Sequence, residues 1–356
     1  MDLQCLEDDI VASQTNTDEF NDLVNFVREE SKLRQLDEAC LSTRSQIGTY
    51  SSEDLVGEMM QKLVTISIGQ RDTTFTPVDK LFDGTFGDLQ TGRGDSLIGF
   101  PTSVGSLDQM IGGWQPQKLY CVAGRPGMGK TAFAVQSACR LAYHENVPVC
   151  FFSIEMPERE LMERIIANLT GIEYWRISKR LLKQEHLDTI ADYRERIIQM
   201  PLYICDSGSL TLSMIIAKVK ALKMRIGDLG PVFLDYLQLM KIPIPRGGNR
   251  DIAIGETTRA LKELTKTQKV PVIILSQVKR AVEERTNSRP TLADLRESGN
   301  IEQDTDAVIF IYRDWVYSQD PAAEKDCELI LPKIRASKVG TLEIGLDLDF
   351  QHFYDR

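Results

Sequence analysis

The sequence is poor in the residues that hold zinc. Its 356 residues include three histidines and seven scattered cysteines, and no two cysteines are spaced C-x-x-C. Structural zinc sites need cysteine and histidine at short, regular spacings, so we expect none here. The odd number of cysteines also argues against a disulfide framework, and a reducing cytosol is the simpler expectation.

Long apolar runs and an excess of basic charge are also missing. The longest apolar runs, such as residues 147–154, are of strand length, and the acidic N-terminus lacks the regions of a signal peptide. We therefore expect no membrane span and a cytoplasmic location. The net charge of −10 argues against a protein that coats nucleic acid nonspecifically, but it is compatible with a local basic lining.

One stretch dominates what the sequence does contain. Residues 124–131 read GRPGMGKT and match the phosphate-loop pattern G-x-x-x-x-G-K-[ST]. An apolar run precedes it and a helical pattern follows it, which is the context that this motif requires. Glycines let backbone N–H groups wrap a phosphate at a helix N-terminus, whereas the alternative is a plain glycine-rich turn. The predicted nucleotide-binding residues are Gly124, Arg125, Pro126, Gly127, Met128, Gly129, Lys130 and Thr131.

Short apolar runs alternate with helical segments from about residue 99 to the C-terminus. This alternation predicts an α/β fold with a mostly parallel central sheet covered on both faces, extended by antiparallel strands at the end. The predicted strands are 118–123, 148–153, 201–205, 231–234, 271–275, 307–312, 326–333 and 341–348.

The N-terminal part is predicted to be helical. Apolar residues recur at mostly three- and four-residue steps from Asp18, and a second helix is expected from about Ser52, where acids follow a serine cap. Residues 69–95 read as a linker with no clear period. We therefore expect the apolar face of the second helix to dock on another subunit instead of folding back.

Polar residues end several of the predicted strands, where open α/β sheets bind their ligands. Asp235 fits a Walker B acid that holds Mg²⁺, or else a turn residue. Glu155 is the candidate general base for water, or else a first-turn acid of a helix near Pro157. Gln277 is the candidate sensor of the γ-phosphate that changes the following loop, 278–289, or else a glutamine that merely ends a strand.

Two groups of cations are candidates for anion binding. Lys333 and Arg335 share one side of a late strand, and from a sheet edge they could reach a neighbouring subunit's γ-phosphate as a trans arginine finger. The alternative is a solvated pair that deters edge pairing. Arg296, with backbone donors near Gly299, and the dibasic loop that ends at Arg250 could hold nucleic-acid phosphates, although such loops are often only solvated. The absence of interleaved aromatics favours sequence-independent contact.

These segments together resemble the replicative DNA helicase family, the DnaB-like hexameric helicases, over roughly residues 20–356. Five strings carry the resemblance in the family's order and intervals. They are GRPGMGKTAF from Gly124, FSIEMP from Phe152, FLDYLQL from Phe233, VPVIILSQ from Val270 and DLRESGNIEQDTD from Asp294.

The resemblance implies a RecA-like P-loop NTPase motor in a hexameric ring, with ATP bound between subunits and single-stranded DNA in the channel. Carried over to the matching residues, it makes Lys130 and Thr131 the phosphate and magnesium residues, with Asp235 the Walker B acid that holds Mg²⁺ through water. Glu155 becomes the catalytic base and Gln277 the coupling residue.

The resemblance also implies roles for the cations. It makes Lys333 and Arg335 the pair that reaches the γ-phosphate in trans. It makes Arg296, Glu297 and Gly299 the DNA-holding loop.

Three parts of the chain follow from the resemblance. Residues 1–50 are expected to be a remnant of a helical collar, 51–98 a linker helix and linker, and 99–356 the motor domain. The linker helix is the second N-terminal helix, which in the family docks on the next subunit.

The chain departs from the family in two places. Only the collar's last helix, near 27–41, is similar, and residues 336–338 read Ala-Ser-Lys where the family tends to have Asn-Gly-Pro.

We therefore expect an ATP- and Mg²⁺-dependent replicative helicase that translocates on single-stranded DNA, 5′ to 3′ by resemblance, in a bacterial or phage-infected cell. Its expected partners are further copies of itself and a loader or primase. One alternative is a collar-less subunit that binds or blocks another helicase ring, which would have no need of Glu155 and Arg335. Another is a RecA-like ATPase of a different task, which the string at 296–304 disfavours.

Overall fold

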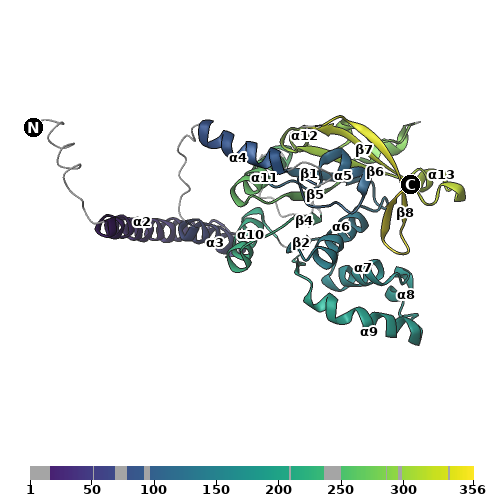
Figure 1. Ribbon diagram of the computed structural model, residues 1–356, viewed down its shortest axis with the longest axis horizontal. Coiled ribbons are helices and arrows are strands. Elements are labelled where there is room, and N and C mark those ends of the chain that lie inside the picture. The colour runs from purple at the N-terminus through teal and green to yellow at the C-terminus, as the bar shows by residue number, and fades with distance from the viewer. Residues whose placement is uncertain are drawn as a thin grey trace, which may run out of the picture. The chain divides into compact units, whose positions relative to one another are not determined.

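The chain divides into two compact units, residues 1–75 and 76–356 (Figure 1). The computed structural model describes residues 17–50, 52–68, 78–91, 97–207, 210–235, 250–285, 287–295, 299–335 and 337–356.

The first unit contains a hairpin of two helices, α2 (Thr17–Ser45) and α3 (Ser52–Ile68), which confirms both predicted helices. The hairpin is closed by side chains as well as by the turn between the helices. Ala39 of α2 is buried, and the Lys62 ammonium donates a hydrogen bond to the Ser42 hydroxyl at 2.7 Å. The expectation that α3 does not fold back was wrong, because α2 of the same chain covers part of its surface.

Residues 69–95, predicted to be an irregular linker, contain a further helix, α4 (Val78–Thr91). The two glycines within it, Gly84 and Gly87, lower helix propensity and hide the period in the sequence. Five apolar residues at helical spacing are exposed on α4: Val78, Leu81, Phe82, Phe86 and Leu89. The rings of Phe82 and Phe86 stack with centroids 5.7 Å apart.

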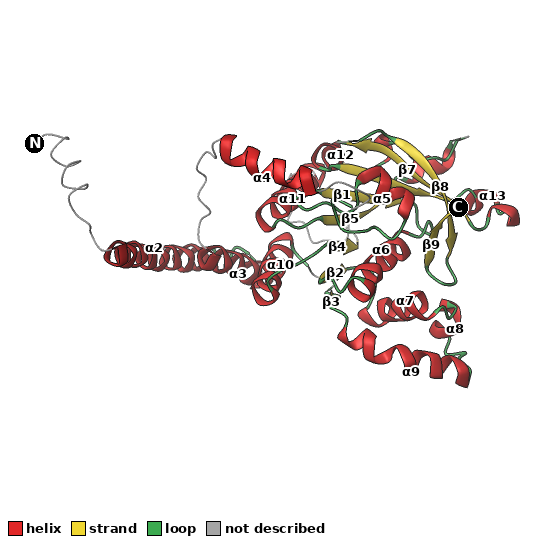
Figure 2. Ribbon diagram, in the orientation of Figure 1, coloured by secondary structure: helices red, strands yellow, loops and turns green. Residues whose placement is uncertain are grey.

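The second unit is built on a sheet that has nine strands among the described residues, in the order β3-β2-β4-β5-β1-β6-β7-β8-β9 (Figure 2). Neighbours from β3 to β6 run parallel, and the pairs from β6 to β9 are antiparallel. The eight predicted strands are confirmed, and β9 is additional. The strands are β1 (Leu119–Gly124), β2 (Val149–Ser153), β3 (Leu202–Cys205), β4 (Val232–Asp235), β5 (Val272–Gln277), β6 (Ala307–Tyr312), β7 (Asp326–Ile334), β8 (Gly340–Asp347) and β9 (His352–Asp355).

Helices cover both faces of this sheet, as predicted. Side chains alternate along β1, so that Val122 packs into the core with Phe133 of α6, while Cys121 packs into the opposite core with Leu261 of α11. The described helices of this unit, besides α4, are α5 (Gly105–Ile111), α6 (Lys130–Cys139), η1 (Arg140–His144), α7 (Glu158–Thr170), α8 (Tyr174–Ser178), α9 (Gln184–Gln199), α10 (Leu212–Ile226), α11 (Arg250–Gln268), η3 (Arg280–Glu284), η4 (Leu292–Asp294), α12 (Gly299–Asp304), α13 (Trp315–Ser318) and η5 (Pro321–Ala323).

None of the helices that the structure describes is both long and apolar enough to cross a membrane.

Candidate nucleotide-binding site

The glycine-rich loop joins the end of β1 to the first turn of α6, as the motif predicts. Gly127 and Gly129 adopt φ angles of +81° and +96°, which L side chains rarely adopt. A Cβ at Gly124 would lie 2.9 Å from the Ile311 carbonyl oxygen. Because α6 begins at Lys130, its first N–H groups and its dipole favour an anion in the loop.

Lys130 is buried, and its ammonium donates a hydrogen bond to the Arg125 carbonyl of the loop at 3.2 Å. Burial lowers the pKa of Lys130 to about 8, while the carboxylates of Asp235 and Glu155 favour its charged form. The lysine that fits the phosphate-binding role therefore shares one site with the two predicted acids.

Asp235 ends β4 beside the loop, and its Oδ2 accepts a hydrogen bond from the Thr131 hydroxyl at 2.8 Å. The side chain is buried, and burial raises the pKa of Asp235 to about 6. Its Oδ1 is also buried and has no hydrogen-bond partner among the described residues. A buried carboxylate oxygen without a partner, next to a hydroxyl, is the donor set that suits a hard cation, so these residues fit Mg²⁺.

Glu155 lies two residues beyond the end of β2, in the turn before α7. The register of β2 against β4 pairs Ser153 with Asp235, which brings this turn to the loop's side of the sheet. The helix begins only at Glu158, so Glu155 is not one of its first-turn acids. An exposed carboxylate beside the loop is accessible to water.

Gln277 is the last residue of β5 and lies opposite Gly124 in the register of β5 against β1. The segment after it is tied to the phosphate loop. The Arg125 guanidinium donates a hydrogen bond to the Val278 carbonyl at 3.0 Å and forms an ion pair with Glu283 at 2.7 Å. The loop arginine therefore links the phosphate loop to the segment that follows Gln277, and the motif alone did not indicate this link.

Lys333 and Arg335 lie at the other end of the sheet. Ile334 between them pairs with Ala307, which pairs with Tyr120 near the start of β1, whereas the phosphate loop follows the end of β1. Tyr120 and Gly124 are four residues apart, so the cation pair and the phosphate loop lie roughly 13 Å apart along β1. The structure therefore does not bring this pair to the phosphate loop of its own chain.

The expectation that the cation pair stands on a sheet edge was wrong, because β7 lies between β6 and β8. The pairing of β7 with β8 ends at Leu331, however. Lys333 and Arg335 therefore lie beyond the part of β7 that β8 covers. Both side chains turn to the same side, as strand alternation predicts. Lys333 donates a hydrogen bond to the Glu302 carbonyl, and Arg335 donates one to the Gln303 carbonyl at 2.7 Å.

The predicted DNA-binding loops fall largely outside the described residues. Arg296 and Glu297 are among the residues that are not described, as is the loop before Arg250. Gly299 begins α12 and Arg250 begins α11. These two helices are neighbours, because the Thr258 hydroxyl of α11 donates a hydrogen bond to the Asp304 carboxylate of α12.

Sequence reasoning missed two charged residues beside the cation pair. Asp306 follows α12, and Lys262 lies on α11, with their charged groups 2.5 Å apart. Neither residue belongs to a sequence motif that would indicate a functional role. Asp306 does, however, close the string DLRESGNIEQDTD, and this was the one available signal.

Comparisons with known proteins identify the family of the chain. Residues 99–355 match the family model of the DnaB-like helicase C terminal domain. The replicative DNA helicase DnaB of Leifsonia xyli subsp. xyli is 35% identical over 93% of this chain and 72% of its own length. That of Geobacillus stearothermophilus is 34% identical over 92% of this chain and 73% of its own length.

Solved structures give the same result. One of them, an isolated ATPase domain, superposes with a TM-score of 0.75 at 30% identity, covering 80% of this chain and all of that domain. A DnaB-like replicative helicase, described with its interactions with primase, superposes with a TM-score of 0.76 at 27% identity, covering 97% of this chain and 80% of its own. The chain therefore belongs to the DnaB-like helicases, a family of ATP-hydrolysing replicative DNA helicases.

Proposed function

We propose that copies of this chain form a hexameric ring in which each ATP lies between the phosphate loop of one subunit and the cations Lys333 and Arg335 of the next. One observation carries this proposal. The loop and the cation pair lie at opposite ends of β1 and its neighbouring strands, so one subunit holds both halves of a site but cannot close it. In a ring with head-to-tail interfaces, the phosphate loop of each subunit faces the opposite end of its neighbour, so the two halves of the site come together at every interface.

Within one subunit, we assign the binding of the phosphates to Lys130 and the backbone N–H groups of the loop. Thr131 and Asp235 would hold Mg²⁺, which neutralises charge on the β- and γ-phosphates. Glu155 accepts the proton of the water that attacks the γ-phosphorus atom, and the bond to the β,γ-bridging oxygen breaks. The neighbour's Arg335 and Lys333 stabilise the negative charge of the transition state.

We assign contact with single-stranded DNA to the two loops that lead into α11 and α12, through Arg250, Arg296, Glu297 and Gly299. Arginines and backbone N–H groups bind phosphate oxygens without reading sequence, as a translocating motor requires. Gln277 and the Arg125–Glu283 link relate the nucleotide state to the protein segment that precedes α12. The proposed motor moves 5′ to 3′ along single-stranded DNA in the cytoplasm. Its product is duplex DNA separated into single strands.

We propose that the exposed apolar face of α4 packs on the next subunit in the ring. Exposed apolar patches of this kind mark interaction sites. Replacing Phe82 and Phe86 by serine is expected to reduce the hexamer fraction at least tenfold at micromolar protein, measured by mass photometry with ATP and Mg²⁺. The exposed Leu181, which lies in none of the segments placed at the subunit junction, is changed to serine as the control. A hexamer fraction that survives the double substitution contradicts this role of α4.

The relatives suggest partners as well as activity. One structural relative is described with its interactions with primase. We propose a primase and a helicase loader as partners of this chain, in addition to single-stranded DNA and further copies of itself.

A forked DNA substrate tests the proposed function directly. We expect ATP hydrolysis to be stimulated by single-stranded DNA, and the fork to be separated when its 5′ tail is free but not when that tail is blocked. A RecA-like ATPase of another task would hydrolyse ATP without separating the fork. A ring-blocking subunit would be inactive alone and would lower the activity of a full-length relative in proportion to its amount.

A further inference from the structure

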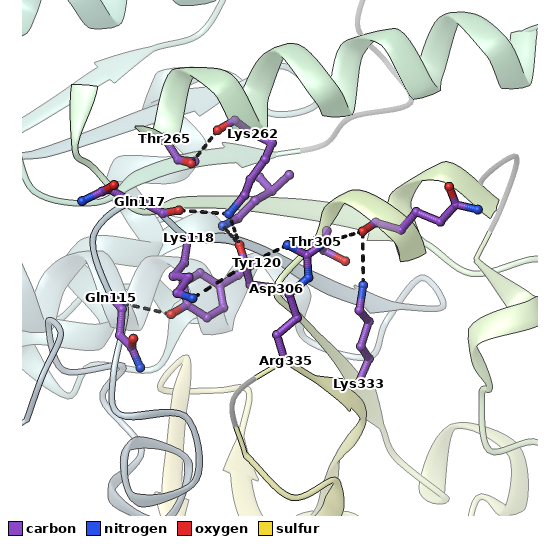
Figure 3. Close-up of polar contacts among 12 residues, drawn as sticks. Gln115, Gln117, Lys118, Tyr120, Lys262, Thr265, Thr305, Asp306, Lys333 and Arg335 are labelled. Atoms are coloured by element: carbon purple, nitrogen blue, oxygen red, sulfur yellow. Dashed lines mark hydrogen bonds and ion pairs between the residues drawn. The ribbon is translucent and has the colours of Figure 1, made fainter. Parts of the chain in front are cut away.

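One buried carboxylate lies at the centre of the cations at the start of β1. The Asp306 side chain is only 7% exposed and forms ion pairs with three cations, which lie on α11, just before β1 and just after β7 (Figure 3). Its oxygens lie 2.5 Å from the Lys262 ammonium, 3.3 Å from the Arg335 guanidinium and 3.9 Å from the Lys118 ammonium. Three cations share one negative charge, so the group is positive overall in a chain whose net charge is −10.

The position of Asp306 is fixed by the backbone. Its N–H donates a hydrogen bond to the Leu119 carbonyl at 2.7 Å, and its Oδ2 accepts one from the Leu119 N–H at 2.8 Å. Its own carbonyl accepts a hydrogen bond from the Arg335 N–H at 2.8 Å. Asp306 therefore holds both the backbone and the guanidinium of Arg335 and locates them relative to β1.

The Arg335 guanidinium is held on two sides and open on another. Asp306 binds Nη1, and the Gln303 carbonyl at the end of α12 binds Nη2. The side chain is still 46% exposed, and it borders a cavity of about 300 Å³ together with Tyr120 and Ser337. The guanidinium thus keeps accessible surface for a further anion.

Lys262 explains why the carboxylate does not simply neutralise Arg335. Its ammonium lies closer to Asp306 than the guanidinium does, and it also donates a hydrogen bond to the Gln117 carbonyl at 3.0 Å. The charge of Asp306 is therefore largely matched by Lys262. Arg335 is oriented by the carboxylate and keeps a positive charge that can act on an incoming phosphate.

We propose that Asp306 is a positioning residue for ATP hydrolysis, which holds the Arg335 guanidinium ready for the γ-phosphate bound by the neighbouring subunit. The inference rests on the proposed function of Arg335. The position of the guanidinium matters because a shift of about 1 Å in a group that stabilises the transition state can reduce the rate about a hundredfold. A long arginine side chain without a fixed partner would not keep that precision.

The test compares Asp306→Asn with Arg335→Ala and with their double variant, in steady-state ATP hydrolysis stimulated by single-stranded DNA. We expect Asp306→Asn to lower kcat between about tenfold and a hundredfold, while KM for ATP changes less than about threefold. The double variant is expected to be no slower than Arg335→Ala alone, because both changes remove one interaction. Asp326→Asn is the matched control, since Asp326 also pairs with an arginine but at an exposed site.

A wild-type kcat for Asp306→Asn, beside a strongly reduced kcat for Arg335→Ala, overturns the positioning role and leaves the proposed function intact. A double variant much slower than Arg335→Ala also overturns it, because Asp306 then acts independently of Arg335. A wild-type kcat for Arg335→Ala overturns the proposed function itself.

Asp306→Asn leaves the Lys262 ammonium with the Gln117 carbonyl but without its carboxylate, and an unneutralised, largely buried charge can prevent folding. The variant Lys262→Gln/Asp306→Asn removes both charges of the closest pair and covers that case. We expect it to melt cooperatively by circular dichroism and to show the same reduced kcat with a KM near the wild-type value. A folded double variant with wild-type kcat overturns the proposal.

Discussion

Replacing Glu155 by glutamine is expected to lower ATP hydrolysis stimulated by single-stranded DNA by about a thousandfold, while ATP binding stays close to that of the wild type. Glutamine keeps the shape of the side chain but cannot accept the proton of the attacking water. Phosphate binding depends instead on the loop and on Lys130, which both remain in place, and a bound phosphate itself favours the charged form of Lys130. Single-turnover hydrolysis and equilibrium binding of a fluorescent ATP analogue measure the two effects separately.

The control for this substitution is Glu158→Gln. Glu158 is the first residue of α7, three positions further along, and is exposed. The Glu158→Gln variant should hydrolyse ATP at the wild-type rate. If Glu155→Gln also hydrolyses ATP at that rate, the base is another group and our assignment of Glu155 is wrong.

Replacing Arg335 by alanine is expected to have an effect at least as large. Arginine fingers contribute about 10³ to 10⁵ in kcat to related phosphoryl transfers, so turnover should fall by at least about a thousandfold. Because the guanidinium is proposed to act on the neighbour's nucleotide, ring formation and the binding of ATP to the phosphate loop should change little. Rapid-quench kinetics on isolated hexamers measures turnover, and mass photometry verifies that the rings are intact.

Arg356→Ala is the matched control for this variant. Arg356 is a partly exposed arginine that follows β9 and pairs with Asp326. A variant at Arg335 that turns over as fast as the one at Arg356 would show that Arg335 has no role in hydrolysis.

The sequence was most informative where the chemistry is local. The phosphate loop is a short motif whose glycines are required by its own backbone, as the φ angles of Gly127 and Gly129 show. The buried strands were predictable because continuous apolar runs are typical of parallel strands covered on both faces. Asp235 and Glu155 could be placed near the loop because the carboxyl ends of parallel strands meet at one edge of the sheet.

The features that were missed depend on contacts distant in sequence. The strand at 341–348 was predicted, but nothing near Lys333 and Arg335 indicates that it pairs with β7 and removes the edge of that strand, or that β9 follows it in the sheet. Asp306 acquires its three cations only when α11, the start of β1 and the end of β7 come together, so no local pattern marks it. Helix α4 was read as a linker because glycine lowers helix propensity.

Mixing two inactive variants tests most directly whether the site is shared between subunits. Lys130→Ala lacks the phosphate-loop lysine but keeps Arg335, whereas Arg335→Ala keeps the loop but lacks the cation. In rings assembled from equal amounts, about a quarter of the junctions combine an intact loop with an intact Arg335. We predict that ATP hydrolysis recovers in the mixture to far above that of either variant alone. No recovery at any ratio, in rings shown by mass spectrometry to contain both variants, would contradict a site formed by two subunits.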